Sequence, residues 1–214
     1  MKAALAGLAL VLGLSVYTYE TNVNSYEALE AATYKVQIMM GEINAGTCTG
    51  TLVAPETLVT AAHCVPDGYT VRVVDKDGVS KETRLIRKDS EKDTALLEVP
   101  MTKNYIPVHR GFLSKYTWVS VIGFPMDQEY VVTQGQYMGL EQSDEVYNGF
   151  SLITAPIAPG NSGGGAFIKT WTGWELIGVA SHVRVVSVGM GGSLVYHLAG
   201  FANLPDLYRF VYGK

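Results

Sequence analysis

From about Thr33 onwards, the chain is a succession of short runs of β-branched and aromatic residues, separated by Gly, Pro, Asp and Asn. Many short strands with frequent turn signals are typical of β-sandwiches and β-barrels. The middle of the chain has no long stretch of apolar residues at helical spacing. The sequence therefore predicts an all-β fold. The expected strands span residues 34–40, 47–53, 57–60, 69–74, 80–87, 95–99, 118–123, 130–137, 150–154, 166–169, 175–181 and 193–197.

A polar segment, residues 103–115, resembles a linker and contains Pro107 and Gly111. It separates the expected strands into two halves of similar length. We expect the first half to span residues 33–110 and the second half to span residues 117–200.

The last residues of the chain, 201–214, follow a different pattern. Apolar side chains recur there at helical spacing after Asn203, and Pro205 stands at an early position, which suits the start of a helix. The sequence predicts a short C-terminal helix that packs on the second half. Its apolar residues are Leu204, Leu207, Phe210 and Val211.

The N-terminus has the pattern of a secretory signal peptide, because Lys2 precedes an apolar run from residue 3 to residue 14. The run falls short of the roughly 20 residues that cross a bilayer comfortably. We interpret residues 1–19 as a signal peptide and residues 20–32 as a leader to the domain. The alternatives are an uncleaved anchor that tethers the protein to a membrane through residues 3–17, and a buried N-terminal helix. A secreted or periplasmic location is expected.

Composition excludes some classes of partner. The net charge is −4, and only 17% of the residues are charged. The chain therefore lacks the basic surface that binds nucleic acid, and we expect no nucleic-acid partner. No glycine-rich fingerprint follows a strand and opens a helix, so a dinucleotide site is not supported.

The two cysteines, Cys48 and Cys64, fit an exported protein in which a disulfide persists. Cys48 lies in the expected strand before His63, so a disulfide would pin the His63 turn to that strand. Two free buried thiols are the alternative. Two cysteines are too few for a structural zinc site, and we expect no metal and no cofactor.

Two other patterns are given no functional role. Residues 75–78, Asp-Lys-Asp-Gly, look like the start of a calcium loop, but the acid required at the twelfth position is replaced by Ile86. A hairpin turn is the better interpretation. His109 and His197 have no ligand partner nearby in the sequence, and both are interpreted as structural.

Three segments carry residues suited to nucleophilic catalysis, in the order His63, Asp93, Ser162. A serine hydroxyl is a poor nucleophile until a base removes its proton, and a histidine base needs a carboxylate on its far nitrogen. Each residue alone has an ordinary interpretation: a packing histidine, an aspartate at the start of a strand, and a serine in a flexible glycine-rich turn.

Together, the three segments resemble the catalytic blocks of trypsin-like serine proteases, most closely those of the HtrA-like and bacterial trypsin-like branch. The resemblance covers roughly residues 33–200, and three blocks in the right order make it specific. It implies two antiparallel six-stranded β-barrels, the first carrying the histidine and the aspartate and the second carrying the serine. The blocks are Thr60-Ala-Ala-His63-Cys64, Asp93-Thr-Ala-Leu-Leu97 and Gly160-Asn-Ser162-Gly-Gly164.

The resemblance also implies a role for each residue. His63 acts as general base and acid, Asp93 orients it, and Ser162 is the nucleophile. The backbone N–H groups of Gly160 and Ser162 form the oxyanion hole. Ser181 matches a residue beside the aspartate, on the strand that pairs with the main chain of the substrate.

Departures from the family change the expectations. Digestive members have an aspartate before the serine, which captures a newly cut N-terminus, whereas this chain has Asn161. We therefore expect an enzyme that is competent on folding, without trimming of its N-terminus. The chain ends soon after the expected second barrel, so the PDZ domain of HtrA proteins and its peptide-gated regulation are not expected.

The specificity pocket is less well determined. Six residues before the serine, trypsin has an aspartate that selects basic residues, and this chain has Pro156. Ile157, Ala158 and Ala180 favour a small or aliphatic P1 residue. His182 either lines the cleft and favours an acidic side chain, or packs as a strand residue.

We conclude that the sequence indicates a serine endopeptidase acting on protein or peptide substrates through an acyl-enzyme. One alternative is a catalytically silent binding protein on the same fold, although the full set of catalytic residues argues against it. Another is an esterase or transferase: Gly160-Asn161-Ser162-Gly163-Gly164 has the Gly-x-Ser-x-Gly spacing of their elbow, but the order His…Asp…Ser fits the protease pattern. The physiological substrate and the oligomeric state are left open.

Overall fold

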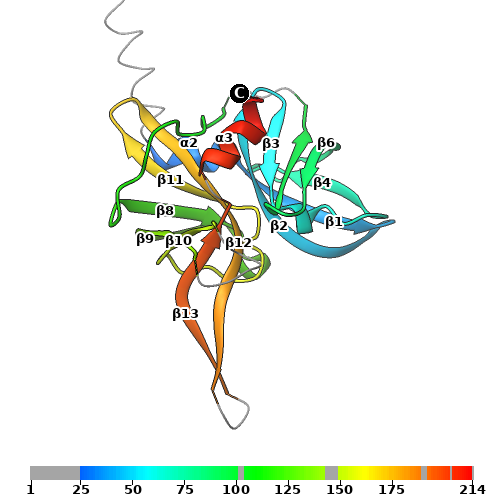
Figure 1. Ribbon diagram of the computed structural model, residues 1–214. Coiled ribbons are helices and arrows are strands. Elements are labelled where there is room, and N and C mark those ends of the chain that lie inside the picture. Colours follow the sequence, from blue (N-terminus) through cyan, green and yellow to red (C-terminus); the bar gives the residue numbers. More distant parts are fainter. Residues whose placement is uncertain (1–24, 101–103, 143–148, 189–191, 203, 214) are drawn as a thin grey trace, which may run out of the picture.

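A computed structural model describes residues 25–100, 104–142, 149–188, 192–202 and 204–213 (Figure 1). Residues 1–19, interpreted as a signal peptide or anchor, lie outside this part of the chain. Within it, no helix is long and apolar enough to cross a membrane. The described chain forms two β-sheet halves and two short α-helices, which confirms the predicted all-β class.

The first half is one antiparallel sheet in the order β5-β4-β1-β2-β3-β7-β6. Its outer strands are consecutive in the chain and are separated only by Thr83, so the sheet bends round on itself. Counted as one bent strand, β5 and β6 complete the six strands that the sequence predicts. The strands are β1 (Thr33–Met40), β2 (Ile43–Ala54), β3 (Thr57–Thr60), β4 (Thr70–Val74), β5 (Ser80–Glu82), β6 (Arg84–Asp89) and β7 (Thr94–Glu98).

The expected strand 80–87 is interrupted at Thr83, and the reason is a local hydrogen bond. The Thr83 hydroxyl and backbone N–H both donate to the Val71 carbonyl, at 2.8 and 3.3 Å. Before Thr83 the chain pairs with β4, and after it the chain pairs with β7. One bent strand, β5 together with β6, therefore forms both outer strands of the sheet.

The second half is a closed barrel of six strands in the order β10-β13-β12-β11-β8-β9, as predicted. β12 and β13 are longer than expected and remain paired to Val188 and Gly192, so they form a hairpin that projects from the barrel (Figure 1). The strands are β8 (Trp118–Gly123), β9 (Val131–Leu140), β10 (Ser151–Ile153), β11 (Gly165–Thr170), β12 (Gly173–Val188) and β13 (Gly192–Phe201).

Two α-helices flank the sheets. The helix α2 (Tyr26–Ala32) was not predicted and lies in the expected leader; it forms because Leu29 and Ala32 are completely buried. The helix α3 (Leu204–Tyr212) confirms the predicted C-terminal helix. Figure 1 shows α3 over the junction of the two halves.

Contacts between the halves place the two strand systems against each other. The Tyr212 hydroxyl donates to the Val53 carbonyl of the first half and accepts from the Val108 N–H of the linker, both at 3.2 Å. The linker runs along β12, where Leu176 exchanges backbone hydrogen bonds with Pro107 and His109. One continuous hydrophobic core extends through both halves.

Candidate active site

His63 lies on a single turn of 3₁₀ helix, Ala62–Cys64, immediately after β3. The Cys48–Cys64 disulfide, with 6.1 Å between the Cα atoms, ties this turn to β2 and rules out the alternative of two free thiols. A disulfide that closes a loop of this size stabilises a fold by about 3 kcal/mol. The disulfide therefore holds His63 at a defined position on the sheet.

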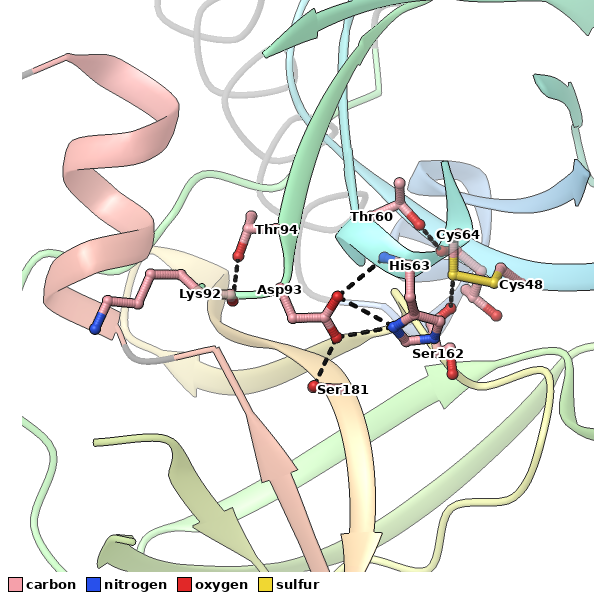
Figure 2. A network of polar contacts seen from close by, with 10 residues as sticks. Cys48, Thr60, His63, Cys64, Lys92, Asp93, Thr94, Ser162 and Ser181 are labelled. Atoms are coloured by element: carbon pink, nitrogen blue, oxygen red, sulfur yellow. Dashed lines mark hydrogen bonds and ion pairs between the residues drawn. A yellow bond between two sulfur atoms is a disulfide. The ribbon is translucent and has the colours of Figure 1, made fainter. Parts of the chain in front are cut away.

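Asp93 occupies the turn between β6 and β7 with a φ of +46°, an unusual conformation for a residue other than glycine. Its carboxylate accepts hydrogen bonds from the His63 N–H (3.0 Å), from His63 Nδ1 (2.9 Å) and from the Ser181 hydroxyl (2.6 Å) (Figure 2). Burial raises the pKa of the Asp93 carboxyl, but these hydrogen bonds outweigh burial and hold the pKa below its usual value. Asp93 is therefore ionised at neutral pH.

The ionised carboxylate decides the tautomer of His63. Because it can only accept hydrogen bonds, Nδ1 of His63 must carry the proton that it donates to Asp93. In the neutral ring, Nε2 is then left with a lone pair. The ring is about half exposed, at 49%, whereas the Asp93 side chain is only 17% exposed. This pair thus presents a proton acceptor toward the surface.

Ser162 lies beside the edge of the His63 ring that faces away from Asp93 (Figure 2). The hydrogen bonds within the described chain include none between the ring and the Ser162 hydroxyl, and catalytic hydrogen bonds are often loose before substrate binds. Cys64 Sγ lies 3.7 Å from the Ser162 carbonyl oxygen. Because this sulfur belongs to the disulfide and carries no hydrogen, the contact is one of packing.

The loop before Ser162 is a tight turn. Pro159 and Gly160 occupy its central positions, and the Asn161 N–H closes it by donating to the Ala158 carbonyl at 3.0 Å. Gly160 has a φ of +98°, in the left-handed region where glycine is favoured. A Cβ at Gly160 would lie 2.3 Å from the Phe124 carbonyl oxygen, so glycine is required there for space as well.

The carbonyls of this turn all have donors, whereas two of its N–H groups have no acceptor. The Pro159 carbonyl accepts from the Met126 N–H at 2.6 Å. Because the peptide is trans and planar, the Gly160 N–H must point the opposite way, away from Met126. In the described part of the chain, neither the Gly160 nor the Ser162 N–H donates a hydrogen bond. The remaining carbonyls of the turn each accept one hydrogen bond: Gly160 O from Thr49 Oγ1 (2.7 Å), Asn161 O from Gly164 N (2.7 Å) and Ser162 O from Thr49 N (2.8 Å).

The residues expected to bind substrate fall into two groups. Ile157 and Ala158 are half-buried at the turn. Ala180 is fully buried, and its backbone exchanges hydrogen bonds with Gly163 and Gly164, which follow Ser162. Ala180 therefore supports the loop that carries Ser162.

Ser181 and His182 complete the expected set. Ser181 lies where the pairing of β12 with β13 shifts register, and its hydroxyl turns toward Asp93. The His182 ring meets the Phe150 ring edge-on at 5.4 Å and packs closely over Gly200. His63, Phe150, Ser181 and His182 all line one open cavity of about 380 Å³ beside the catalytic pair.

Three contacts, two in the site and one outside it, were not foreseen from the sequence. The first is Thr49, whose hydroxyl reaches Gly160 in the other half. The second is the Met126 N–H on Pro159. The third is the partner of His109, which is Glu175, at 2.5 Å between Nδ1 and Oε2. The His197 side chain lies outside the described residues. Cys48, His63 and Cys64 lie near enough to share a metal ion, but both sulfurs are used in the disulfide.

Comparisons with known proteins agree with this geometry. Residues 48–179 match the family described as the trypsin-like peptidase domain. A probable periplasmic serine endoprotease, DegP-like, from Bartonella henselae is 35% identical over 115 residues, which cover 51% of this chain and 23% of that protein. A putative serine protease HhoB from a Synechocystis strain is 30% identical over 156 residues, covering 68% of this chain and 36% of that protein. The chain thus spans less than half the length of either relative.

A solved structure shares the fold. The serine endoprotease from Yersinia pestis superposes with a TM-score of 0.67 at 24% identity, covering 89% of this chain and 66% of that chain. At this identity, the likeness supports the two-part β architecture alone. The shared architecture corresponds to the two β-sheet halves shown in Figure 1.

Proposed function

Since the chain belongs to the trypsin-like peptidase domain family, we propose that it is a serine endopeptidase that hydrolyses protein or peptide substrates through an acyl-enzyme. The observation that carries the proposal is the arrangement around Ser162. An ionised Asp93 fixes the His63 tautomer, and the backbone N–H groups of Gly160 and of Ser162 itself have no acceptor among the described residues. These are the parts that acyl transfer requires.

In the proposed mechanism, Ser162 Oγ attacks the scissile carbonyl carbon while its proton passes to Nε2 of His63. The carbonyl oxygen becomes an oxyanion that accepts hydrogen bonds from the Gly160 and Ser162 N–H groups. His63 then gives the proton to the leaving amine as the C–N bond breaks. Water, deprotonated by His63, attacks the acyl-enzyme ester and releases the acid and Ser162. Asp93 remains ionised and stabilises the imidazolium in both steps.

The enzyme is proposed to be active without N-terminal trimming. Asn161 occupies the position of the aspartate that captures a new N-terminus in digestive relatives, and it is buried, at 1% exposure. The hydrogen bonds of the turn already leave the Gly160 N–H directed away from Met126. The turn therefore needs no ion pair with a new N-terminus to take this shape.

The substrate preference is proposed to be a small or aliphatic P1 residue. Pro156 offers no charge for a basic side chain, and the neighbouring residues Ile157 and Ala158 are apolar. A pocket of this kind discriminates by only about 1–3 kcal/mol per methylene group, so cleavage should be permissive. A series of peptides that differ only at P1 would test the preference, and faster cleavage after Arg or Lys would overturn it.

An exported location is proposed as well. The leader pattern of residues 1–19 and the disulfide fit a secreted or periplasmic protein, or one anchored by an uncleaved leader. The relative from Bartonella henselae is named as periplasmic. N-terminal sequencing of the exported protein would distinguish a cleaved leader from an anchor.

The decisive experiment is labelling with a fluorophosphonate probe, followed by intact mass and peptide mapping, with Ser162→Ala as the matched control. One adduct on Ser162, absent from Ser162→Ala and lost in His63→Ala, is expected. A folded wild-type protein that takes up no probe would instead favour a catalytically silent binding protein.

A further inference from the structure

Thr49, on β2 of the first half, contacts the turn of the second half that precedes the nucleophile. It is completely buried. Its hydroxyl lies 2.7 Å from the Gly160 carbonyl oxygen and 3.1 Å from the Phe124 nitrogen. A carbonyl can only accept and a backbone N–H can only donate, so the hydroxyl donates to Gly160 and accepts from Phe124. One side chain thus satisfies two backbone groups from separate segments.

Both of these segments control the direction of the Gly160 N–H. The hydroxyl fixes the peptide that follows Gly160 by holding its carbonyl. Through Phe124, it also fixes the start of the loop whose Met126 N–H holds the Pro159 carbonyl at 2.6 Å. That second bond orients the peptide that carries the Gly160 N–H. Thr49 therefore acts on the peptides on both sides of Gly160.

The Met126 loop has little packing of its own to hold it in place. Met126 and Asp127 both have positive φ values, +54° and +58°, and Met126 is 69% exposed. Consecutive left-handed residues other than glycine are strained and persist only where the surroundings impose them. The first half also holds this loop through Lys35, whose Nζ lies 2.9 Å from Asp127 Oδ1, and through a side-chain hydrogen bond of Thr47 to Asp127. Polar contacts from β1 and β2 therefore impose the shape of this loop.

We propose that Thr49 is a positioning residue for the oxyanion hole, holding the turn in the form that directs the Gly160 N–H at the substrate carbonyl. This inference rests on the proposed peptidase function. Because an oxyanion forms only during the reaction, the hydroxyl should matter for the transition state far more than for substrate binding.

The test compares Thr49→Val, which keeps the shape and removes the hydroxyl, with Thr49→Ser, which keeps the hydroxyl. Thr49→Val should lower kcat about 10- to 100-fold, somewhat less than the loss of an oxyanion donor itself, with KM nearly unchanged. Thr49→Ser should retain most of kcat. A peptide boronate, which forms a tetrahedral adduct, should lose affinity in proportion to kcat, whereas a product peptide should not.

Matched controls come from the same fold. Thr51, also on β2, is fully buried, and its hydroxyl has no hydrogen-bond partner among the described residues. Thr33, on β1, is buried with a hydroxyl that donates to the Leu29 carbonyl at 2.7 Å rather than to the turn. Thr51→Val and Thr33→Val should leave kcat unchanged, although Thr33→Val should lower the melting temperature.

Several results would overturn the proposal. They are an unchanged kcat in Thr49→Val, an equal loss of kcat in Thr33→Val, and no rescue by serine. If Thr49→Val folds poorly, Thr49→Ala removes the hydroxyl without placing a methyl group against Gly160, and it should show the same loss of kcat. A wild-type protein that neither cleaves peptides nor takes up the probe would overturn the peptidase function and this inference with it. Activity in the wild type together with an unaffected Thr49→Val would overturn the inference alone.

Discussion

Among the described residues, His63–Asp93 and His109–Glu175 are both histidine–carboxylate pairs, and they differ in what surrounds the second ring nitrogen. In both, Nδ1 faces a carboxylate: Asp93 for His63 and Glu175 for His109. The His63 ring is 49% exposed and has Ser162 at its far edge (Figure 2). The His109 side chain is 18% exposed, and Nε2 lies against Gly111, where a Cβ would approach it to 2.7 Å.

The carboxylates are also held differently. Asp93 accepts from Ser181 in the other half, so this pair joins the two halves at the cleft. Glu175 accepts from Thr170 and Thr172, both at 3.1 Å, on its own hairpin. His109 lies on the linker, so its pair fastens the linker to the second barrel. Of these two pairs, only His63–Asp93 has a serine beside the free ring nitrogen (Figure 2), whereas His109–Glu175 serves as a structural clamp.

The largest expected difference between the pairs is in catalysis by the imidazole. His63→Ala should lower kcat by about 10⁶-fold, because the serine loses its base. His109→Ala should leave kcat nearly unchanged, since its Nε2 lies against Gly111. Steady-state kinetics on one peptide substrate would measure kcat for both variants. A comparable loss of kcat in His109→Ala would contradict the assigned difference between the two histidines.

The carboxylates should differ next. Asp93→Asn should lower kcat about 10⁴-fold, because the amide favours the wrong tautomer of His63. Glu175→Gln should instead lower the free energy of unfolding by about 1–2 kcal/mol with little effect on kcat. Activity assays combined with urea unfolding would separate the two effects. Equal effects of both variants on kcat would contradict the assigned roles.

Ser181 gives a further difference between the two carboxylates, because it supports Asp93 from the other half. Ser181→Ala should lower kcat roughly 3- to 10-fold through loss of a hydrogen bond to a charged group. It should also raise the pKa of Asp93, which this bond lowers. Thr172→Val, which removes a hydroxyl from Glu175, is the matched control and should not alter kcat. No difference between these two variants would mean that the Ser181 bond is dispensable.

The smallest effect concerns stability in acid. Burial raises the pKa of Glu175, but its hydrogen bonds to His109, Thr170 and Thr172 outweigh burial and hold it below its usual value. Such a carboxyl stabilises the fold above its unfolded-state pKa, about 4.3, and loses this contribution as the pH falls through its lower folded-state pKa. The difference in unfolding free energy between wild type and Glu175→Gln should therefore be full at pH 6 and shrink below about pH 4. A difference in unfolding free energy that grows as the pH falls would contradict this prediction.

Local patterns account for the parts of the fold that were predicted. The span of β3 (Thr57–Thr60) coincides with the expected one, and α3 (Leu204–Tyr212) lies within the expected helical segment 201–214, because side-chain periodicity and turn residues are local properties. The helix α2 (Tyr26–Ala32) was missed because seven residues are too few to be helical alone. It depends on burying Leu29 against sheets that form elsewhere in the chain.

His63, Asp93 and Ser162 could be located from the sequence, since each lies within a short and recognisable motif. The resemblance also placed Ser181 beside Asp93, but the hydrogen bond of its hydroxyl to that carboxylate, across 88 residues, is seen only in the folded chain. The Thr49 hydroxyl, which reaches Gly160 across 111 residues, was not foreseen at all. Glu175 meets His109 across 66 residues. A hydrogen bond depends on the position of two atoms, and partners this far apart leave no periodic pattern in the sequence that would reveal them.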